Sequence, residues 1–472
     1  MRISLREAAA AAPQAVALIV SEGADAAKAP ATFTFGALWQ AVAPLVRWLT
    51  MQAAGRRVAL VADNRLPTAL WLYALLERGL PTVLIHPRLS ARERAEQLAE
   101  VAPVLLIDES TPLPRGSMVT DPAQPLPRGT EPQFILFTSG TTGRPKGAML
   151  SPAALCASAE ASARNLGWRP DDRWLLAMPL AHIGGLSILV RCLLARATVV
   201  LRSGAFEVPA LVRAIERHRV TLLSLVPTML TRLLDRQPPW QPPPHLRALL
   251  LGGAAASPAL IERAAARGVP VLTTYGLTET SSQVTTQRYG TPPAPAQGSG
   301  PPIDGVEVRI RDGLIEVRGP VLFDGYYPPE RHGSPLVDGW FSTGDLGYLD
   351  GEGRLHVLAR RTDLIVSGGE NVYPLEVEQA LEGCPGIAAA CVFGEPDEEW
   401  GQRVVAAVVA QGARPSDEQL ATELAARLAR FKHPRRLAWL EGLSYGPSGK
   451  LERAATASRA RPELRPFPRR PD

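Results

Sequence analysis

A ten-residue stretch at 138–147 carries a dense set of groups that could bind phosphate. It reads Thr-Ser-Gly-Thr-Thr-Gly-Arg-Pro-Lys-Gly and contains no acidic residue. Glycines let a backbone approach a ligand closely, and backbone N–H groups and hydroxyls can then surround phosphate oxygens while Lys146 adds positive charge. We therefore predict a phosphate-binding loop; the plainer alternative is a flexible surface loop.

The stretch lacks two common nucleotide-binding motifs. The usual phosphate loop ends in Gly-Lys-Ser/Thr, whereas here Pro145 precedes Lys146 and Gly147 follows it. No Gly-x-Gly-x-x-Gly run follows a predicted strand either. The residues that we predict to contact phosphate in this loop are Thr138, Ser139, Gly140, Thr141, Thr142, Gly143 and Lys146.

A second stretch, Tyr-Gly-Leu-Thr-Glu-Thr at 275–280, follows a predicted strand. The ring of Tyr275 could stack on a base, the hydroxyls could bind phosphate, and Glu279 could hold Mg²⁺. The alternative is a helix start with a capping threonine and an acidic first turn.

Two further stretches could bind a ribose. Trp-Phe-Ser-Thr-Gly-Asp at 340–345 places Asp345 in a predicted turn, where it could accept hydrogen bonds from a diol; the alternative is an Asx turn. Arg360 begins a run that leads into Ser-Gly-Gly-Glu-Asn at 367–371. This arginine could pair with phosphate or ribose and the glycines could flank a narrow channel, or the run could be an interdomain linker.

Two single residues complete the candidate set. Lys450 ends a Ser-Gly-Lys turn near the end of the chain, and His182 lies at a predicted strand-to-helix turn. Taken alone, such a lysine is usually a solvated charge and such a histidine is usually a structural group.

The elements that must position these residues alternate between strand and helix. This alternation over 57–107 and 173–274 predicts parallel sheets with helical crossovers. An apolar strand at 134–137 precedes the phosphate loop, and Ser151 with Pro152 predicts the start of the next helix. Strict apolar–polar alternation after Gly298 predicts a small antiparallel unit.

We predict an α/β protein with two domains and a tail. A large N-terminal domain of mainly parallel sheets flanked by helices, with a small β unit, spans 1–361. A small mobile α+β domain spans 362–456, and a disordered tail rich in arginine and proline spans 457–472. In the small domain, Ser416 and Gln419 predict a capping box. One apolar face of the helix that follows is predicted at Leu420, Leu424, Leu428 and Phe431.

Composition excludes several classes of partner. The 51 Lys and Arg and the 46 Asp and Glu are spread along the chain without a basic block containing aromatics, so we expect no nucleic acid partner. No 18-residue apolar run predicts a membrane span. The four cysteines form no zinc motif, so we expect buried thiols in a reducing compartment. Without a signal peptide pattern, we expect a cytoplasmic protein.

Taken together, these motifs resemble those of the adenylate-forming superfamily of acyl-CoA synthetases, adenylation domains and firefly-type luciferases. The resemblance covers about 8–455 and rests on the order of the stretches at 138–147, 275–279, 342–345 and 360–376, followed by Lys450. The combination is specific, although no single stretch is.

The resemblance implies a role for each stretch. The loop at 138–147 would bind the ATP phosphates, Tyr275 would stack on adenine, Thr278 would contact the α-phosphate, and Glu279 would hold Mg²⁺. Asp345 and Arg360 would hold the ribose, and Lys450 would bridge the acyl carboxylate and the α-phosphate. The remaining implied ATP-site residues are Gly253, Ala254, Thr274 and Gly276.

The implied reaction has two steps. A carboxylate attacks the α-phosphate of Mg-ATP to give an acyl-adenylate and pyrophosphate, and a CoA thiol then displaces AMP. The small domain would rotate about Thr362, so that Lys450 leaves and Gly368 and Gly369 face the CoA channel. Many members carry Asp or Lys at the hinge position, and Ala359 replaces a usual glycine. The expected partners are a small carboxylic acid, ATP, CoA and, as a possibility, further copies of this chain.

The segment at 180–191 resembles that of o-succinylbenzoate–CoA ligases of menaquinone synthesis, as do 367–374 and 400–402. For such an acid, His182 would close an aryl slot and act in catalysis with Lys450, Thr278 and Glu279. Ser187 or Arg191 would bind the carboxylate that is not activated. The simpler prediction for Arg191 is a helix-surface arginine.

Other functions stay open. Within the class, the chain could be another aryl- or medium-chain fatty acyl-CoA ligase. It could also be a stand-alone adenylation protein that loads a carrier thiol, although no carrier domain follows Lys450, or a luciferase-like oxygenase. A regulatory nucleotide-binding protein without catalysis is disfavoured because both Glu279 and Lys450 are present.

Overall fold

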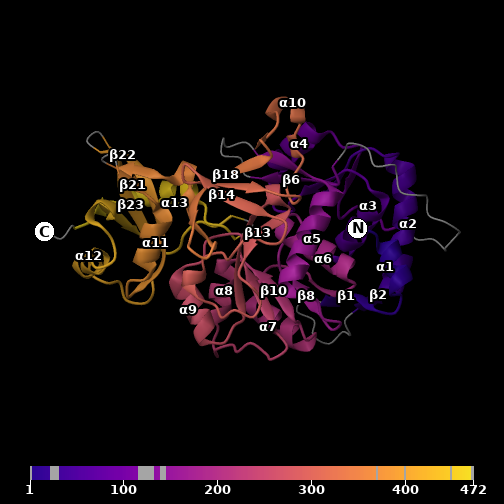
Figure 1. Ribbon diagram of the computed structural model, residues 1–472, viewed down its shortest axis with the longest axis horizontal. Coiled ribbons are helices and arrows are strands. Elements are labelled where there is room, and N and C mark those ends of the chain that lie inside the picture. Colours follow the sequence, from indigo (N-terminus) through magenta and orange to yellow (C-terminus); the bar gives the residue numbers. More distant parts are fainter. Residues whose placement is uncertain are drawn as a thin grey trace.

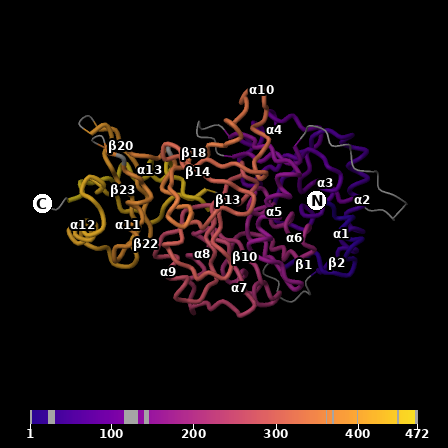
Figure 2. Tube along the Cα trace, viewed as in Figure 1, coloured from indigo at the N-terminus to yellow at the C-terminus, as the bar shows by residue number. Residues whose placement is uncertain are grey.

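The computed structural model describes residues 3–21, 31–114, 132–138, 145–367, 370–397, 400–446 and 449–468. A large domain contains the N-terminal three quarters of the chain, and a smaller domain lies against one end of it (Figure 1). The tube in Figure 2 follows the chain from the large domain, indigo to orange, into the small domain, orange to yellow.

An eight-stranded sheet forms one layer of the large domain. Its inner strands are parallel, and its two edge strands run antiparallel to their neighbours. In spatial order they are β13 (Ser282–Thr286), β12 (Val271–Leu277), β11 (Ala248–Leu251), β10 (Leu222–Leu225), β8 (Arg173–Leu176), β9 (Thr198–Arg202), β1 (Val16–Ser21) and β2 (Ala31–Thr34). The predicted parallel sheet is therefore confirmed over 173–274.

A six-stranded sheet forms a second layer. In spatial order its strands are β16 (Gly325–Tyr327), β7 (Lys146–Leu150), β6 (Phe134–Thr138), β4 (Thr82–Ile85), β3 (Val58–Val61) and β5 (Leu105–Ile107). The predicted strands before the phosphate loop are parallel, whereas β7 and β16 add an antiparallel edge.

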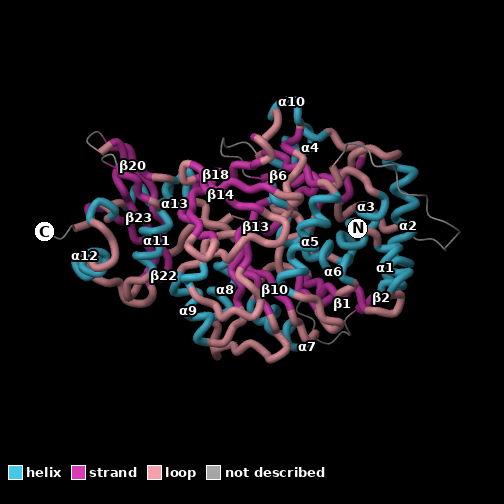
Figure 3. Tube along the Cα trace, in the orientation of Figure 1, coloured by secondary structure: helices cyan, strands magenta, loops and turns pink. Residues whose placement is uncertain are grey.

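Helices cover and separate these sheets, as the cyan segments of Figure 3 show. They are α1 (Leu5–Ala11), α2 (Phe35–Ala53), α3 (Leu66–Arg78), α4 (Ala91–Val101), α5 (Pro152–Leu166), α6 (Ile183–Ala195), α7 (Val208–Arg217), α8 (Pro227–Leu234), α9 (Pro258–Ala266) and α10 (Pro329–His332). One hydrophobic core joins α2, α3, α5 and α6 to strands of both sheets. Ser151 caps α5 by accepting from the amide of Ala154, which confirms the predicted helix start.

An antiparallel sheet completes the large domain. Its strands are β14 (Glu307–Arg311), β15 (Leu314–Arg318), β18 (Trp340–Leu349), β17 (Leu336–Val337) and β19 (Leu355–Arg360). The predicted antiparallel unit is confirmed. The predicted turn at Asp345 is wrong, because Asp345 lies within the long strand β18 and pairs with Arg360 of β19.

The small domain is a six-stranded sheet with three α-helices, as its α+β prediction requires. The strands are β21 (Glu370–Val372), β20 (Ile365–Ser367), β23 (Gly401–Ala410), β24 (Arg436–Trp439), β25 (Arg465–Pro466) and β22 (Ile387–Asp397). The helices are α11 (Pro374–Glu382), α12 (Asp417–Ala425) and α13 (Arg453–Ala460). Its core is separate from that of the large domain.

Two predictions for the small domain are wrong in part. The capping box of Ser416 and Gln419 is present, but α12 ends at Ala425, so Leu428 and Phe431 do not extend its apolar face. The predicted disorder from 457 onward does not hold through 468, because α13 continues to Ala460 and β25 pairs with β24. Residues 469–472 lie outside the described part.

None of the four cysteines forms a disulfide, and all four are buried, as expected for thiols that serve as small apolar side chains. None of the described helices is long and apolar enough to cross a membrane.

Candidate active site

The phosphate loop connects two antiparallel strands, β6 and β7. Thr138 and Lys146 face each other in register, and the Thr138 hydroxyl donates to the Lys146 carbonyl at 3.3 Å. Lys146 and Gly147 are therefore strand residues, and the prediction that they belong to the loop is wrong. Five predicted phosphate contacts lie outside the described residues; they are Ser139, Gly140, Thr141, Thr142 and Gly143.

Strand β16 brings a tyrosine to the end of this loop. The Lys146 ammonium lies 5.3 Å from the centre of the Tyr326 ring, and the Tyr326 hydroxyl donates to Oε1 of Glu279 at 2.9 Å. Tyr326 thus joins the predicted phosphate and magnesium residues. Sequence analysis missed it because its role depends on which sheet edge β16 occupies, and the only local signal is its place in a Gly-Tyr-Tyr strand.

The two predicted ribose residues lie side by side with Tyr275. The register of β18 and β19 places Arg360 opposite Asp345, with Nε 3.2 Å from Oδ1. The Tyr275 hydroxyl donates to Oδ2 of Asp345 at 2.6 Å. Burial raises the pKa of Asp345, and the positive charge of Arg360 opposes this shift. These three residues form a polar cluster that a nucleotide could enter by exchanging hydrogen-bond partners.

The residues of β12 beside Tyr275 form part of the backbone of the site, and their side chains bond or pack within the sheet. The Thr274 hydroxyl donates to the Thr285 carbonyl at 2.8 Å inside the sheet. A Cβ at Gly276 would lie 1.7 Å from the Ser282 carbonyl, so only glycine fits there. The strand then ends in one 3₁₀ turn, η1 (Thr278–Thr280), instead of the alternative helix start.

Lys450 reaches this site from the small domain. A Cβ placed on Gly253 would lie 4.0 Å from Cε of Lys450. As a whole residue, Lys450 is exposed. The protein close to its ammonium and the positive charge of Arg360 lower the pKa of Lys450, whereas the carboxylates of Asp345 and Glu279 oppose this shift. The structure therefore brings Lys450 together with the predicted nucleotide residues.

Of four further predicted residues, three lie near the junction of the two domains in the chain. Ala254 is exposed in the same turn as Gly253. Thr362 is exposed in the single turn η3 (Arg361–Asp363), which connects β19 to the small domain. Gly368 and Gly369 fall in a gap between the described ranges.

His182 precedes α6 and faces a second histidine. Its ring centre lies 5.0 Å from that of His86, and its buried Nε2 has no hydrogen-bond partner among the described residues. Burial, together with His86 and Lys450, lowers the pKa of His182 to about 4. The imidazole is therefore neutral near pH 7 and can act there as a hydrogen-bonding wall, not as a cation.

Arg191 is buried inside α6, so the prediction of a helix-surface arginine is wrong. Arg191 is only 3% exposed. Nη2 donates to the Ser282 hydroxyl at 3.2 Å, the guanidinium lies 5.5 Å from the Trp174 ring centre, and Nε has no partner in the described structure. Burial lowers the pKa of Arg191 to about 10, so the cation persists at neutral pH without a carboxylate beside it.

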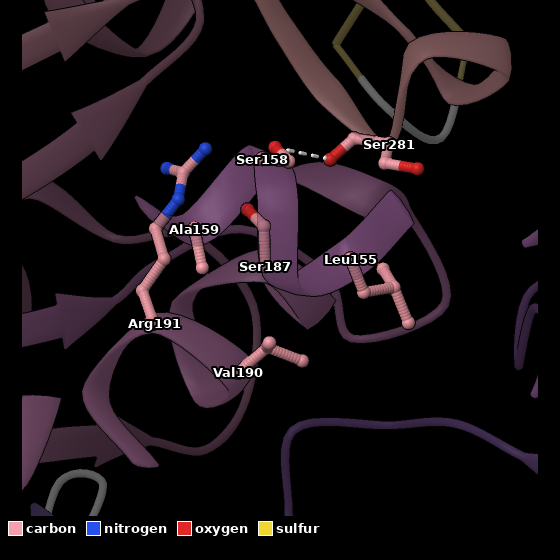
Figure 4. A pocket seen from close by; sticks show the side chains of 7 residues that line it. All are labelled: Leu155, Ser158, Ala159, Ser187, Val190, Arg191 and Ser281. Carbon is pink, nitrogen blue, oxygen red and sulfur yellow. Dashed lines mark hydrogen bonds between the residues drawn. The ribbon is translucent and has the colours of Figure 1, made fainter. Parts of the chain in front are cut away.

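Arg191 and Ser187 line one narrow cavity between α5, α6 and the turn after η1 (Figure 4). The space is too narrow to admit a water molecule as the side chains stand, and its lining residues are Leu155, Ser158, Ala159, Ser187, Val190, Arg191 and Ser281. The Ser158 hydroxyl donates to the Ser281 carbonyl at 2.8 Å, whereas the Ser281 hydroxyl has no partner among described groups. The polar atoms here that lack a partner in the described structure are Nε of Arg191 and the Ser281 hydroxyl, so an anion could bind them only after the lining side chains move apart. His182 lies outside this space, at the start of the same helix.

The donor set at Glu279 fits a nucleotide-bound magnesium ion. The described residues contain no group of three side chains that could cage a metal. Glu279 is 9% exposed and follows the hydroxyl of Thr278. Magnesium commonly takes one or two protein carboxylates and completes its coordination with substrate phosphates and water, so a single buried carboxylate is sufficient here.

The fold and this site define a class of protein. The family model described as AMP-binding enzyme matches residues 5–327, and the model of the AMP-binding enzyme C-terminal domain matches 376–450. The chain belongs to the AMP-binding enzyme family, and the predicted superfamily and fold class are confirmed.

Individual relatives are similar to this chain along most of its length. The 2-succinylbenzoate–CoA ligase of Bacillus pumilus is 38% identical over 426 residues, which cover 84% of this chain and 87% of that protein. The o-succinylbenzoate CoA synthetase of Bacillus subtilis with its acyl-adenylate intermediate is 34% identical, with a TM-score of 0.83, and the match covers 96% and 97% of the two chains. The structure of the same synthetase in complex with ATP and magnesium ion is 34% identical, with a TM-score of 0.81, and the match covers 96% of this chain and 98% of that chain.

Proposed function

We propose that this chain is an ATP-dependent acid–CoA ligase that activates 2-succinylbenzoate through an acyl-adenylate. The observation that carries the reaction class is the convergence of Lys450, from the small domain, on Asp345, Arg360 and Glu279 of the large domain. Relatives with the 2-succinylbenzoate activity align along most of the chain and support the choice of acid.

In the first step, an oxygen of the acid attacks the α-phosphorus of ATP. The new oxygen–phosphorus bond forms as the bond to pyrophosphate breaks, and pyrophosphate leaves. Both reactants are anions, so the protein must compensate negative charge as they approach. Lys146 and Lys450 supply positive charge, and Thr278 contacts the α-phosphate. Glu279 would hold magnesium, which shields the phosphate charge when bound.

The nucleotide is held at the polar cluster of Tyr275, Asp345 and Arg360. Tyr275 stacks on the adenine, and the Asp345 carboxylate accepts hydrogen bonds from the ribose while Arg360 keeps it oriented. The loop residues from Thr138 to Gly143 surround the phosphates. Further walls of the ATP site are formed by Gly253, Ala254, Thr274 and Gly276.

In the second step, the CoA thiol attacks the acyl carbonyl. The carbon–sulfur bond forms, the bond to AMP breaks, and the thiol proton passes to solvent. The small domain, which we assign to 362 onward, rotates about Thr362 between the steps. Lys450 then leaves the site, and Gly368 and Gly369 line the CoA channel. One site thereby performs two reactions with one moving domain.

The acid has two carboxylates, of which one is activated. The other would pair with Arg191 and Ser187 in their cavity. A buried guanidinium without a carboxylate is costly to maintain, and a substrate carboxylate would remove that cost. Neutral His182 closes the slot for the aromatic ring. We place the enzyme in the cytoplasm, because none of its four cysteines forms a disulfide.

Pyrophosphate release with a panel of acids tests this function. The panel contains 2-succinylbenzoate, substituted benzoates and short- and medium-chain fatty acids, each with and without CoA. We expect the highest kcat/KM with 2-succinylbenzoate and AMP formation that needs CoA for full turnover. Best turnover with a fatty acid would reject the assigned acid, and no turnover with any acid would reject the ligase reaction.

A further inference from the structure

The small domain contacts two helices of the large domain that no step of the proposed reaction uses. In the first turn of α8, the Thr228 hydroxyl donates to the Gly449 carbonyl at 3.3 Å. At the start of α9, the Ser257 hydroxyl faces the carboxyl of Glu382, the last residue of α11, and opposes the rise in the pKa of that carboxyl. Both contacts join residues more than 100 positions apart in the chain.

The contact at α8 is closely packed and lies beside Lys450. Gly449 has a φ of +76°, and a Cβ there would lie 2.9 Å from Cγ2 of Val226 and 3.1 Å from Oγ1 of Thr228. Val226 also packs against Gly253, whose own added Cβ would lie 3.2 Å from Cγ1 of Val226 and 4.0 Å from Cε of Lys450. The residue before the lysine is therefore seated on α8 while the lysine side chain passes over Gly253.

We propose that the first turns of α8 and α9 form a docking seat for the small domain, with Thr228 and Ser257 as positioning residues for Lys450. This inference rests on the proposed two-step function. The seat holds the orientation in which Lys450 faces the nucleotide residues. Because Lys450 must leave before the thiol step, the seat contributes to acyl-adenylate formation and not to thioester formation.

Threonine 228 offers a matched pair of variants. Thr228→Val keeps the volume and removes the hydroxyl, whereas Thr228→Ser keeps the hydroxyl. We expect Thr228→Val to slow acyl-adenylate formation about three- to tenfold, the effect of one hydrogen bond. Thioester formation from supplied acyl-adenylate should stay within about twofold of wild type, and Thr228→Ser should retain both rates.

Serine 257 offers a second pair that keeps the helix start. The Ser257 side chain accepts from the Leu260 amide at 3.3 Å as the cap of α9, so its O–H remains to bond Glu382. Aspartate and asparagine both cap helices well. Ser257→Asp would place a second carboxylate against Glu382 and weaken docking, whereas Ser257→Asn keeps a donor toward it.

Spin labels give a readout of docking without activity. Met51 in the large domain and Phe431 in the small domain are 72% and 39% exposed, and the native cysteines are buried, so Met51→Cys with Phe431→Cys can be labelled selectively. In the full-length protein, the distance between these labels reports the domain orientation. We expect Ser257→Asp to deplete the docked distance and Ser257→Asn to leave it unchanged.

The two readouts separate the docking seat from the proposed function. Equal slowing of both half-reactions by Thr228→Val, no slowing of either, or identical distances in Ser257→Asp and Ser257→Asn would overturn the seat. If wild type forms no acyl-adenylate with any acid, the proposed function fails. In that case, the label distances decide whether the seat exists.

Discussion

The proposed nucleotide side and the proposed acid side of the site differ in how an arginine is paired. On the nucleotide side, Arg360 pairs with Asp345, and Tyr275 donates to the same carboxylate. On the acid side, Arg191 is buried with a hydroxyl and an aromatic ring beside it, and no carboxylate of the described residues pairs with it.

This difference indicates how each side recognises its ligand. On the proposed nucleotide side, the arginine is already paired with a carboxylate, so ATP would bind there by exchanging partners. On the proposed acid side, the arginine has no carboxylate partner among the described residues. A buried group that only the correct ligand can pair gives strong discrimination, because a ligand without that group leaves the charge unpaired.

The largest expected effect comes from Lys450, which lies between the two sides. Lys450→Ala should lower acyl-adenylate formation about a thousandfold with every acid, because it removes a cation aimed at the charge that develops in the first step. Thioester formation from supplied acyl-adenylate should persist. Rapid-quench measurement of each half-reaction checks this. Lys432→Ala, which removes a lysine paired with Glu376 elsewhere in the small domain, serves as the control. Equal loss of both half-reactions would reject the role of Lys450.

Arg191→Met should affect the acid and not the nucleotide. We expect kcat/KM for 2-succinylbenzoate to fall about 30- to 100-fold, since a carboxylate would lose its charged partner. A substrate analogue that lacks the carboxylate not activated should react equally with variant and wild type. The free energy of unfolding should not decrease, because methionine replaces a buried charge with an apolar side chain. If both acids lose activity to the same extent, the acid-side assignment is wrong.

Asp345→Asn should affect the nucleotide and not the acid. It keeps a hydrogen-bonding side chain between Tyr275 and Arg360 but removes the charge. We expect the KM for ATP to rise about tenfold, the loss of charge-assisted bonds to ribose, by the same factor for every acid. Steady-state kinetics with two different acids measures this, and a factor that depends on the acid would contradict the division between the two sides.

The smallest expected effect is a pH dependence of folding stability at Glu382. Burial raises the pKa of this carboxyl to about 7 from an ordinary 4.5. The groups that face it are Glu378 on its own helix, the Ala390 amide of β22, Ser257 of α9, and Tyr445. The folded protein binds this proton more tightly than the unfolded chain, so the free energy of unfolding should decrease as pH rises from about 4.5 to about 7 and stay constant above that.

Glu382→Gln carries no titrating group and isolates this effect. Between pH 5.5 and 7.5, the free energy of unfolding should decrease by about 1–2 kcal/mol more for wild type than for the variant. Chemical denaturation at several pH values measures this. A wild-type stability that rises relative to the variant over this range would contradict the predicted direction.

Local patterns predicted most of the fold. An apolar run predicted the strand before the phosphate loop, and Ser151 marked the start of α5, whereas the strand β7 between them was not predicted. Asp345 and Arg360 were both predicted to bind a ribose, but Asp345 was placed in a turn and the two side chains were not predicted to pair. Their pairing depends on the register of β18 and β19, which a single sequence does not reveal.

Two errors had signals that were available. Arg191 stands in the run Ile-Leu-Val-Arg-Cys-Leu-Leu, and a helix apolar on all sides is buried on all sides. Beyond residue 457, the small apolar residues Ala457 and Ala460 bury against the sheet, although the abundant arginine and proline nearby suggested disorder. In both cases, the prediction relied on the charged residues and gave too little importance to the apolar residues around them.

The docking contacts could not be predicted from sequence. Thr228 and Gly449 meet only because two domains adopt one orientation, and neither residue has a distinctive local pattern. The same is true of Ser257 and Glu382. Such contacts depend on tertiary geometry, whereas motif residues carry their chemistry in their own spacing.

The central claim is that this chain joins an acid to AMP before it joins it to CoA. The direct measurement is to incubate the enzyme with 2-succinylbenzoate, ATP and magnesium without CoA, to quench one sample, and to add CoA to the other. We predict enzyme-bound acyl-adenylate with one pyrophosphate for each adenylate, and its conversion to thioester and AMP after CoA is added. Formation of ADP and phosphate, or thioester formation without an adenylate that CoA can consume, would contradict the account.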